Sequence, residues 1–309
     1  MTTKEELVWQ DDIAEPDAAS RRQDRCPVCD VGLDVGALPA IVLRLARGRQ
    51  VWAKCPNCRS FFAAVSYDAE QEVGHTRTRA WGKVETGVSL GEAKGRLFDA
   101  ILRVLREVAP REGSLLDIGC SYGSFLERAR NEGYRVRGVD IVPEAVDYVR
   151  SLGIACDRAA SVADLDIPAS SQDVISVLDC NCYWPNHRRE LRAIRALLHP
   201  GGLLVMRVVD TSWAMQIGMW IFRPLHAAGR RLCERVVYDH RVSVPVGSLL
   251  QVVREEGFSV VYTSVRDAVP FRHNDLKTQA AYAIGRVFWR IARFNLAPGL
   301  VFVARKERS

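Results

Sequence analysis

The strongest fold signal of the chain lies in Leu115–Gly153, which reads LLDIGCSYGSFLERARNEGYRVRGVDIVPEAVDYVRSLG. The apolar run Ser114–Ile118 is typical of a short buried strand, and helical spacing of apolar residues follows at Phe125–Asn131. The pattern then repeats, with a second strand expected at Tyr134–Val139 and a second helix at Pro143–Ser151. Successive βα units predict a parallel sheet with helices on both faces.

The same alternation continues along the rest of the chain. We therefore expect an α/β fold with a doubly wound, Rossmann-like sheet, in which ligands bind at the carboxyl ends of the strands. Further helices are expected at 97–108, Arg188–Leu198 and Val246–Glu256, and further strands at Asp173–Leu178, Leu203–Val209, Phe258–Ser264 and Leu300–Arg305.

The turn after the first strand favours a cofactor that carries no phosphate. Gly119 and Gly123 let the backbone pass close to a ligand at the start of a helix. Asp140 ends the second strand, where a carboxylate can accept hydrogen bonds from two ribose hydroxyls. A nicotinamide dinucleotide would prefer G-x-G-x-x-G, whereas this loop reads G-x-S-x-G and directly follows Asp117. Both features fit S-adenosylmethionine.

These motifs, in this order, resemble the class I S-adenosylmethionine-dependent methyltransferases over residues 96–265 and the last strand. In that family the first glycine loop holds the methionine part of the cofactor and the acid that ends the second strand holds the ribose. The segment Ser161–Leu165 resembles the family's loop at the adenine edge. The cofactor-binding residues that the resemblance implies are Asp117, Gly119, Ser121, Gly123, Asp140, Ile141, Val162, Ala163 and Asp179.

Four of the nine cysteines form two identical frames, Cys26-Pro-Val-Cys29 and Cys55-Pro-Asn-Cys58. Each frame turns so that two thiolates point at one ion, and two such knuckles complete a closed four-sulfur site, which predicts a structural Zn²⁺ held by Cys26, Cys29, Cys55 and Cys58. A hairpin of Ala40–Leu45 and Gln50–Lys54 fits the spacing between them. An iron site with the same ligands and a redox-active thiol pair are the alternatives.

Composition and motifs divide the chain into four parts. We expect a flexible tail at 1–24, a zinc-ribbon module at 25–66, a linker at 67–95, and a methyltransferase domain at 96–309 with an insertion at about 211–245. The apolar segment Trp213–Leu232 fits a packed helix, a lid over a hydrophobic acceptor or an interfacial helix. The amphipathic stretch Ala281–Phe294 fits a cover for the active site, a partner contact or a membrane-surface helix.

The pairing of a zinc ribbon with this domain resembles a bacterial subgroup of the family that often acts on sugars, polysaccharides or secondary metabolites. This resemblance implies a small-molecule, glycan or lipid-linked acceptor. Many relatives carry Glu-His shortly after the fourth strand, where this chain has Cys182-Tyr183. Tyr183 and His240 are therefore the candidate catalytic residues, and His187 fits a solvated helix start.

The net charge of the chain bears on the alternative functions. The chain carries +6, of which residues 1–24 contribute −4, so the remainder is basic. A basic body allows an RNA methyltransferase that uses its ribbon for RNA, although no dense Lys/Arg block interleaved with aromatics supports it. A non-catalytic scaffold is the other alternative. The sequence predicts no signal peptide and no transmembrane helix, hence a cytoplasmic protein with, at most, peripheral membrane contact.

Overall fold

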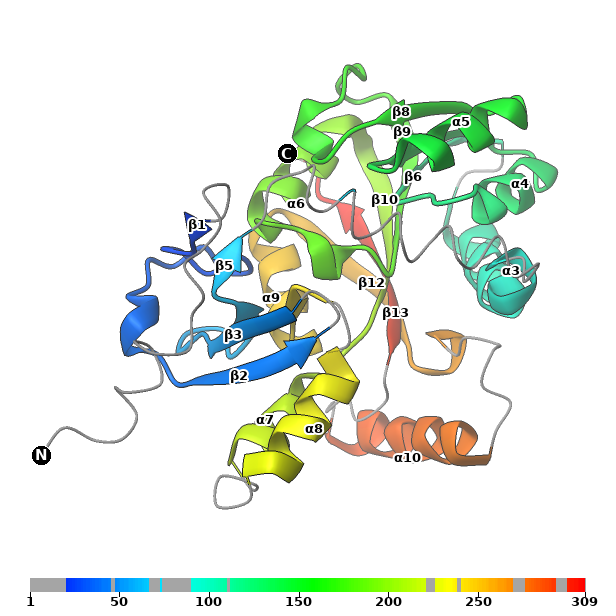
Figure 1. Ribbon diagram of the computed structural model, residues 1–309. Coiled ribbons are helices and arrows are strands. Elements are labelled where there is room, and N and C mark those ends of the chain that lie inside the picture. The colour runs from blue at the N-terminus through cyan, green and yellow to red at the C-terminus, as the bar shows by residue number, and fades with distance from the viewer. Residues whose placement is uncertain are drawn as a thin grey trace, which may run out of the picture.

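The computed structural model describes residues 21–45, 48–66, 73, 90–109, 112–220, 226–237, 240–268, 276–292 and 299–308. A seven-stranded sheet in the order β12-β13-β10-β9-β6-β7-β8 forms its centre (Figure 1). The strands are β6 (Ser114–Ile118), β7 (Arg135–Asp140), β8 (Ala155–Arg158), β9 (Gln172–Leu178), β10 (Leu198–Val208), β12 (Phe258–Ser264) and β13 (Leu300–Lys306).

The doubly wound α/β prediction is confirmed, with one correction to the strand directions. Neighbours from β10 to β8 pair in parallel, whereas β13 runs antiparallel to both β10 and β12. The register places Leu300 opposite Val208 and Val301 opposite Ser264, so β13 enters the sheet at the edge where its neighbours end. The segment between β12 and β13 therefore does not cross a face of the sheet, because it begins and ends at the same edge. β13 consequently runs antiparallel to its neighbours.

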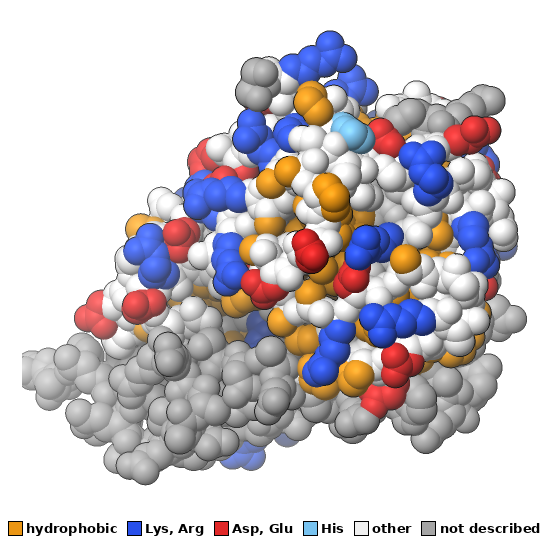
Figure 2. Space-filling model, turned by 90° about the horizontal axis from the view of Figure 1, so that it is seen from above, with side chains coloured by type: hydrophobic (Ala, Val, Ile, Leu, Met, Phe, Trp, Pro, Cys, Tyr) orange, Lys and Arg blue, Asp and Glu red, His pale blue; other side chains and the backbone are white. Residues whose placement is uncertain are grey.

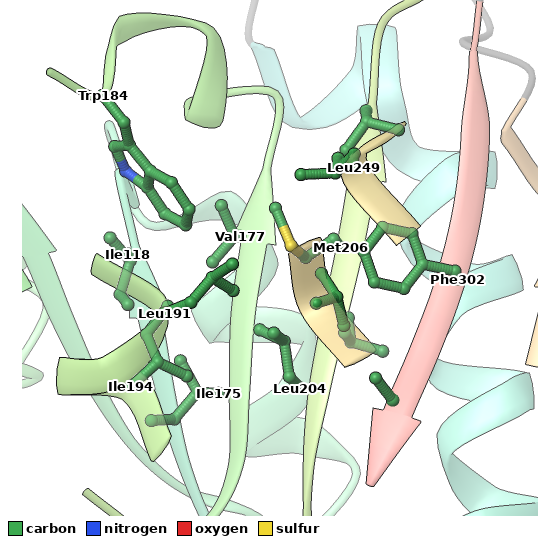
Figure 3. Close-up of a cluster of buried hydrophobic side chains, with 14 of the residues drawn as sticks. Ile118, Ile175, Val177, Trp184, Leu191, Ile194, Leu204, Met206, Leu249 and Phe302 are labelled. Atoms are coloured by element: carbon green, nitrogen blue, oxygen red, sulfur yellow. The ribbon is translucent and has the colours of Figure 1, made fainter. Parts of the chain in front are cut away.

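Helices cover both faces of the sheet. On one side lie α3 (Leu90–Val108), α4 (Ser124–Asn131) and α5 (Pro143–Ser151), and on the other α6 (His187–Leu197) and α9 (Val246–Glu255) (Figure 1). Apolar residues of α6 and α9, such as Leu191, Ile194 and Leu249, pack on the sheet against residues such as Met206 and Phe302 (Figure 3).

The first helix begins earlier than the linker boundary at 95 allows, because α3 starts at Leu90. Gly91 and Gly95 are poor helix formers and conceal this first part of the helix in the sequence. The glycine at 95 has a packing role, since a Cβ there would lie 2.8 Å from Nη2 of Arg128 on α4.

The ribbon forms a second sheet in the order β11-β4-β3-β2. The expected hairpin is present as β2 (Ala40–Leu45) and β3 (Gly48–Lys54), followed by β4 (Phe61–Ala63) and β5 (Val65–Ser66). Part of the expected tail belongs to this module, because β1 (Arg21–Arg22) pairs with β5, while residues 1–20 lie outside the described residues.

The two described helices of the insertion pack on the ribbon. The insertion contains α7 (Ser212–Trp220), α8 (His226–Val237) and β11 (Val242–Ser243), and β11 pairs with β4 as the fourth strand of the ribbon sheet. Trp52 and Phe61 of the ribbon are fully buried with Met215, Cys233 and Val237 of the insertion. Ribbon and insertion therefore share one hydrophobic core. Among the described residues, no helix combines the length and apolar character that crossing a membrane requires.

Candidate functional site

A cavity of about 470 Å³ opens at the carboxyl ends of β6, β7 and β9, where the fold predicts a ligand. One part of its wall comes from the sheet and includes Gly119, Asp140 and Asp179. Another part comes from the ribbon and the insertion, and includes Phe62 and Val242. The remaining lining residues that the argument below uses are Pro27, Val65, Lys94, Ser121, Ile141, Val162, Tyr183, Trp184, Glu190 and Arg241.

Asp140 and the glycine loop form the best-defined polar part of the cavity. The backbone N–H groups of Ser121 and Val142 donate to the two carboxylate oxygens of Asp140, at 2.8 and 2.9 Å. Burial raises the pKa of Asp140, and these backbone donors oppose the rise. Gly119 and Gly123 both have φ of +73°, and a Cβ on Gly119 would lie 2.7 Å from Cβ of Cys180. The loop therefore needs glycine at this position.

This donor and acceptor set fits an adenosine-containing cofactor. The Asp140 carboxylate retains lone pairs for ribose hydroxyls after accepting one bond on each oxygen. Ile141 and Val162 provide apolar contact beside it. The residues between Gly119 and Gly123 are Cys120, Ser121 and Tyr122, so the loop carries no cation for a pyrophosphate.

Asp117 lies beneath this loop and does not line the cavity. Its side chain is buried, and Oγ of Ser176 donates to its Oδ1 at 2.7 Å. Burial raises the pKa of Asp117 to about 7, while the bond from Ser176 and the charge of Lys94 oppose the rise. Its position supports the loop from below, which differs from the direct contact with the cofactor that the resemblance implies.

The loop between β8 and β9 is held by Glu190, a residue that the sequence analysis did not identify. Glu190 on α6 is 1% exposed and accepts hydrogen bonds from Oγ of Ser161 at 2.6 Å and from the Val162 backbone N–H at 2.7 Å. Ala163 is exposed and its N–H donates to Oγ of Ser161. Val162 therefore faces the cavity, whereas Ala163 lies outside its lining.

Asp179 ends β9 in a left-handed conformation, with φ of +68°. Its carboxylate pairs with Arg207 of β10 and accepts a hydrogen bond from Nζ of Lys94 at 2.9 Å. Burial alone would raise the pKa of Asp179, but the charges and hydrogen bonds of Arg207 and Lys94 lower it to about 2. The carboxylate thus stays ionised, and its ion pairs hold the backbone in place at the floor of the cavity, where the chain leaves β9.

The two catalytic candidates lie next to each other. Tyr183, in the short 3₁₀ helix Asn181–Tyr183, lines the cavity. The ring of His240 contacts the Tyr183 ring edge-on, with centroids 6.1 Å apart. His240 itself is outside the lining, and its neighbour Arg241 is within it.

His187 is not at a solvated helix start, which corrects the expectation. The side chain is fully buried and packs edge-on against Trp184, with ring centroids 5.4 Å apart. Burial lowers the pKa of His187 to about 4, so the ring is neutral near pH 7. Its Nδ1 lies 3.0 Å from the carbonyl oxygen of Pro27, which only accepts, so Nδ1 carries the proton. The His187 backbone N–H donates to the same oxygen at 2.7 Å.

The four knuckle cysteines converge, as predicted. Their sulfur atoms all lie within 4.8 Å of one another, with Cys26–Cys58 at 3.6 Å and Cys29–Cys55 at 3.8 Å. A tetrahedral ion with bonds of about 2.3 Å places its sulfur ligands about 3.8 Å apart. The cluster therefore fits a closed tetrahedral Zn²⁺ site.

The first knuckle packs directly against the start of α6. Besides the two bonds to Pro27, Nε of Arg188 donates to the Cys29 carbonyl at 3.1 Å and Nδ2 of Asn186 donates to Asp30 at 3.2 Å. The second knuckle contacts α9, where Oγ of Ser248 donates to the Cys58 carbonyl at 2.7 Å. The ribbon is thus a fixed part of the site, although its sequence reads as a separate module.

The structure brings together six of the nine residues implied for the cofactor, namely Gly119, Ser121, Asp140, Ile141, Val162 and Asp179. Asp117, Gly123 and Ala163 lie outside the lining. The sequence reasoning missed Glu190, Lys94 and the ribbon wall. The apolar run Ser60–Val65, which includes Phe62, was a sequence signal for that wall, because a solvent-exposed end of a zinc module would not require such a run.

Comparisons with known proteins agree with this geometry. A family model described as a methyltransferase domain matches residues 90–263. Two curated relatives are named ubiquinone biosynthesis O-methyltransferase. The protein from Xanthomonas axonopodis pv. citri is 30% identical over 115 residues, which cover 35% of this chain and 48% of the relative. The protein from Cereibacter sphaeroides is 27% identical over 155 residues, which cover 44% and 62%. The chain thus spans about half to three fifths of these relatives' lengths.

A solved structure from Listeria monocytogenes, provisionally named as an S-adenosylmethionine-dependent methyltransferase, has the same fold. It is 14% identical with a TM-score of 0.50, and the match covers 69% of this chain and 100% of that one. At this identity the likeness concerns the fold alone.

Proposed function

This chain belongs to the methyltransferase-domain family, and we propose that it transfers the methyl group of S-adenosylmethionine to an apolar small molecule. One observation carries the proposal: a single cavity joins the cofactor-type wall at Asp140 to an apolar wall at Phe62 and Trp184. A cofactor and an acceptor can therefore meet in one space, of which the ribbon forms part of the wall.

The residues of the chain act mainly by positioning. S-adenosylmethionine, when bound, supplies an electrophilic sulfonium methyl group. Asp140 would hold the ribose, while Ile141 and Val162 would enclose the adenine. Holding an acceptor in line and excluding water then accounts for most of the rate increase that this reaction needs.

An oxygen acceptor also has to lose a proton. An acceptor hydroxyl that took the methyl group would give up its proton to a base at that end of the cavity. Tyr183 faces the cavity and His240 contacts its ring, so this pair would receive the proton at the acceptor end. The names of the relatives, which refer to O-methylation in ubiquinone biosynthesis, support a hydroxylated aromatic acceptor.

The four-cysteine site would hold Zn²⁺ in a structural role. Four thiolates leave no open position for a reacting ligand. The contacts of both knuckles with α6 and α9 indicate what the ion stabilises, which is the ribbon wall of the cavity.

The first test is calorimetric titration of S-adenosylmethionine into the zinc-loaded protein. We expect saturable binding that Asp140→Ala weakens strongly. Asp157→Ala is the matched control, because Asp157 lies on the neighbouring strand β8 and pairs with Arg137 outside the cavity lining. Absence of binding by the folded wild-type protein would refute the proposed cofactor.

The second test measures release of S-adenosylhomocysteine with hydroxylated aromatic acceptors. Removing a general base typically lowers kcat by about 10²–10⁴. We expect such a loss in His240→Gln or Tyr183→Phe, with the affinity for S-adenosylmethionine unchanged. Full turnover by both variants would remove this pair from the mechanism.

A further inference from the structure

The helix α10 (Leu276–Ala292) presents an apolar stripe to solvent. Ile284, Val287, Phe288 and Ile291 are 53%, 54%, 44% and 81% exposed. Their spacing of three and four residues places them on one face. Of the large hydrophobic residues exposed on the described part of the chain, the majority belong to this stripe. A contiguous set of this kind marks a binding surface, unlike apolar residues that are scattered singly.

The opposite face holds the helix on the protein, so the stripe is presented in a fixed orientation. Tyr282 is 2% exposed and its hydroxyl donates to the Ala268 carbonyl at 3.3 Å. Trp289 packs against the main hydrophobic core. Because α10 is already anchored by this face, the stripe is available for an external surface.

The charge of α10 indicates which kind of external surface the stripe would bind. The segment 276–292 contains Lys277, Arg286 and Arg290 and no acidic residue. Arg286 and Arg290 are both exposed, and Arg290 lies three residues after Val287, at the edge of the stripe. Cationic side chains next to exposed apolar ones are typical of a helix that lies in the interface of an anionic membrane. A contact between two copies of the stripe would instead bring like charges together.

The position of α10 links this surface to the cavity. The Ala268 carbonyl that accepts from Tyr282 also accepts from Nη2 of Arg207, which pairs with Asp179 on the cavity floor. In Figure 1, α10 lies at the end of the molecule opposite α4 and α5. The face seen from above in Figure 2 shows Lys/Arg and Asp/Glu intermingled.

We propose that α10 is an interfacial helix that seats the protein on an anionic lipid bilayer, with the stripe inserted among the lipids and the arginines at the head groups. This orientation turns the cavity end of the sheet toward the membrane. The inference rests on the surface alone and does not depend on the proposed methyl transfer.

The test is flotation of the full-length protein with vesicles of phosphatidylcholine and phosphatidylglycerol, and with vesicles of phosphatidylcholine alone. We expect binding to the anionic vesicles that weakens as salt is raised. The double variant Phe288→Glu, Ile291→Glu should lower the partition coefficient by about tenfold or more. Arg286→Gln with Arg290→Gln should lower it by a similar factor.

The matched control is Tyr148→Glu, which removes an apolar side chain that is 47% exposed on α5 at the other end of the molecule. Thermal unfolding confirms that each variant is folded. Wild-type protein that stays unbound with anionic vesicles, or α10 variants that float as well as wild type, would overturn the proposal. Sedimentation that shows a dimer broken by the α10 variants would also overturn it, since the stripe would then contact a second copy.

Discussion

Glu190 offers the sharpest test of how the fold positions the cofactor. Its carboxylate on α6 reaches across to the loop after β8 and is the acceptor for two buried donors, Oγ of Ser161 and the backbone N–H of Val162. Replacement by leucine keeps a similar volume but removes both acceptors. Buried donors without an acceptor cost about 1–3 kcal/mol each.

We expect Glu190→Leu to lower the free energy of unfolding by about 3 kcal/mol, after some offset from the apolar side chain. An unfolding entropy of about 2.1 cal/mol/K per residue converts this loss into a Tm lower by about 5 °C for 309 residues. The dissociation constant for S-adenosylmethionine should rise by about tenfold or more, because binding must then order the Val162 loop.

Glu190→Gln separates hydrogen bonding from charge. The glutamine oxygen can accept from Val162, and its amide can donate to the lone pair of Ser161 Oγ that the Ala163 N–H leaves free, but the Ser161 hydroxyl then loses its acceptor. We therefore expect Glu190→Gln to cost about 1 kcal/mol of stability, which is less than the cost of Glu190→Leu.

Asp99→Asn is the matched control for this series. Asp99 pairs with Arg128 outside the cavity lining, the two side chains are 55% and 38% exposed, and such pairs contribute at most about 1 kcal/mol. The measurements are thermal unfolding with and without S-adenosylmethionine, and calorimetric titration. A Glu190→Leu protein with the Tm and affinity of wild type would refute the assigned role of this carboxylate.

Three further predictions follow from buried charges and the metal. The native carboxyl of Asp117 keeps its proton up to a pKa of about 7, whereas the unfolded one loses it near 3.8, so the wild-type protein loses stability as the pH rises from about 4 to 7. Asp117→Asn removes this loss, and its stability relative to wild type should rise over the same range by roughly 4 kcal/mol. A difference in urea unfolding that does not change with pH would contradict this prediction. Asp179→Asn should cost about 3 kcal/mol by leaving Arg207 buried without its carboxylate, and the double variant with Arg207→Met should recover stability in the same unfolding assay. Removal of zinc by a chelator should abolish acceptor turnover, because the ribbon wall is lost; activity that persists at a verified zero zinc content would show that the wall stands without the ion.

Most of the order of elements was predictable because those elements carry a local signal, whereas the strand β8 was not among the expected ones. The strands at Ser114–Ile118 and Phe258–Ser264 and the helix at Pro143–Ser151 were placed with the observed bounds. The knuckle cysteines were equally readable, since their spacing alone specifies the geometry of a tetrahedral site. Local periodicity does not determine the direction of the last strand, because direction depends on where the intervening chain returns to the sheet.

The residues that the sequence did not reveal depend on contacts between distant elements. Glu190 resembles any acidic residue in the first turn of a helix, where a negative charge is common. Its function depends on α6 packing beside the Ser161 loop. His187 likewise follows a regular N-cap at Asn186, and it is buried by Trp184 and by the docked ribbon at Pro27.

The helix α6 connects the four-cysteine site to the polar wall of the cavity, although the cysteines themselves lie outside that wall. The same helix receives the first knuckle at its start, through His187 and Arg188, and holds the adenine-side loop through Glu190. His187 and Glu190 are three residues apart, so they lie within one turn of a single rigid helix. A displacement of the knuckle at Pro27 would therefore move the carboxylate that fixes Val162. Zinc binding and cofactor binding should then be thermodynamically coupled, with each ligand raising the affinity for the other by the same factor.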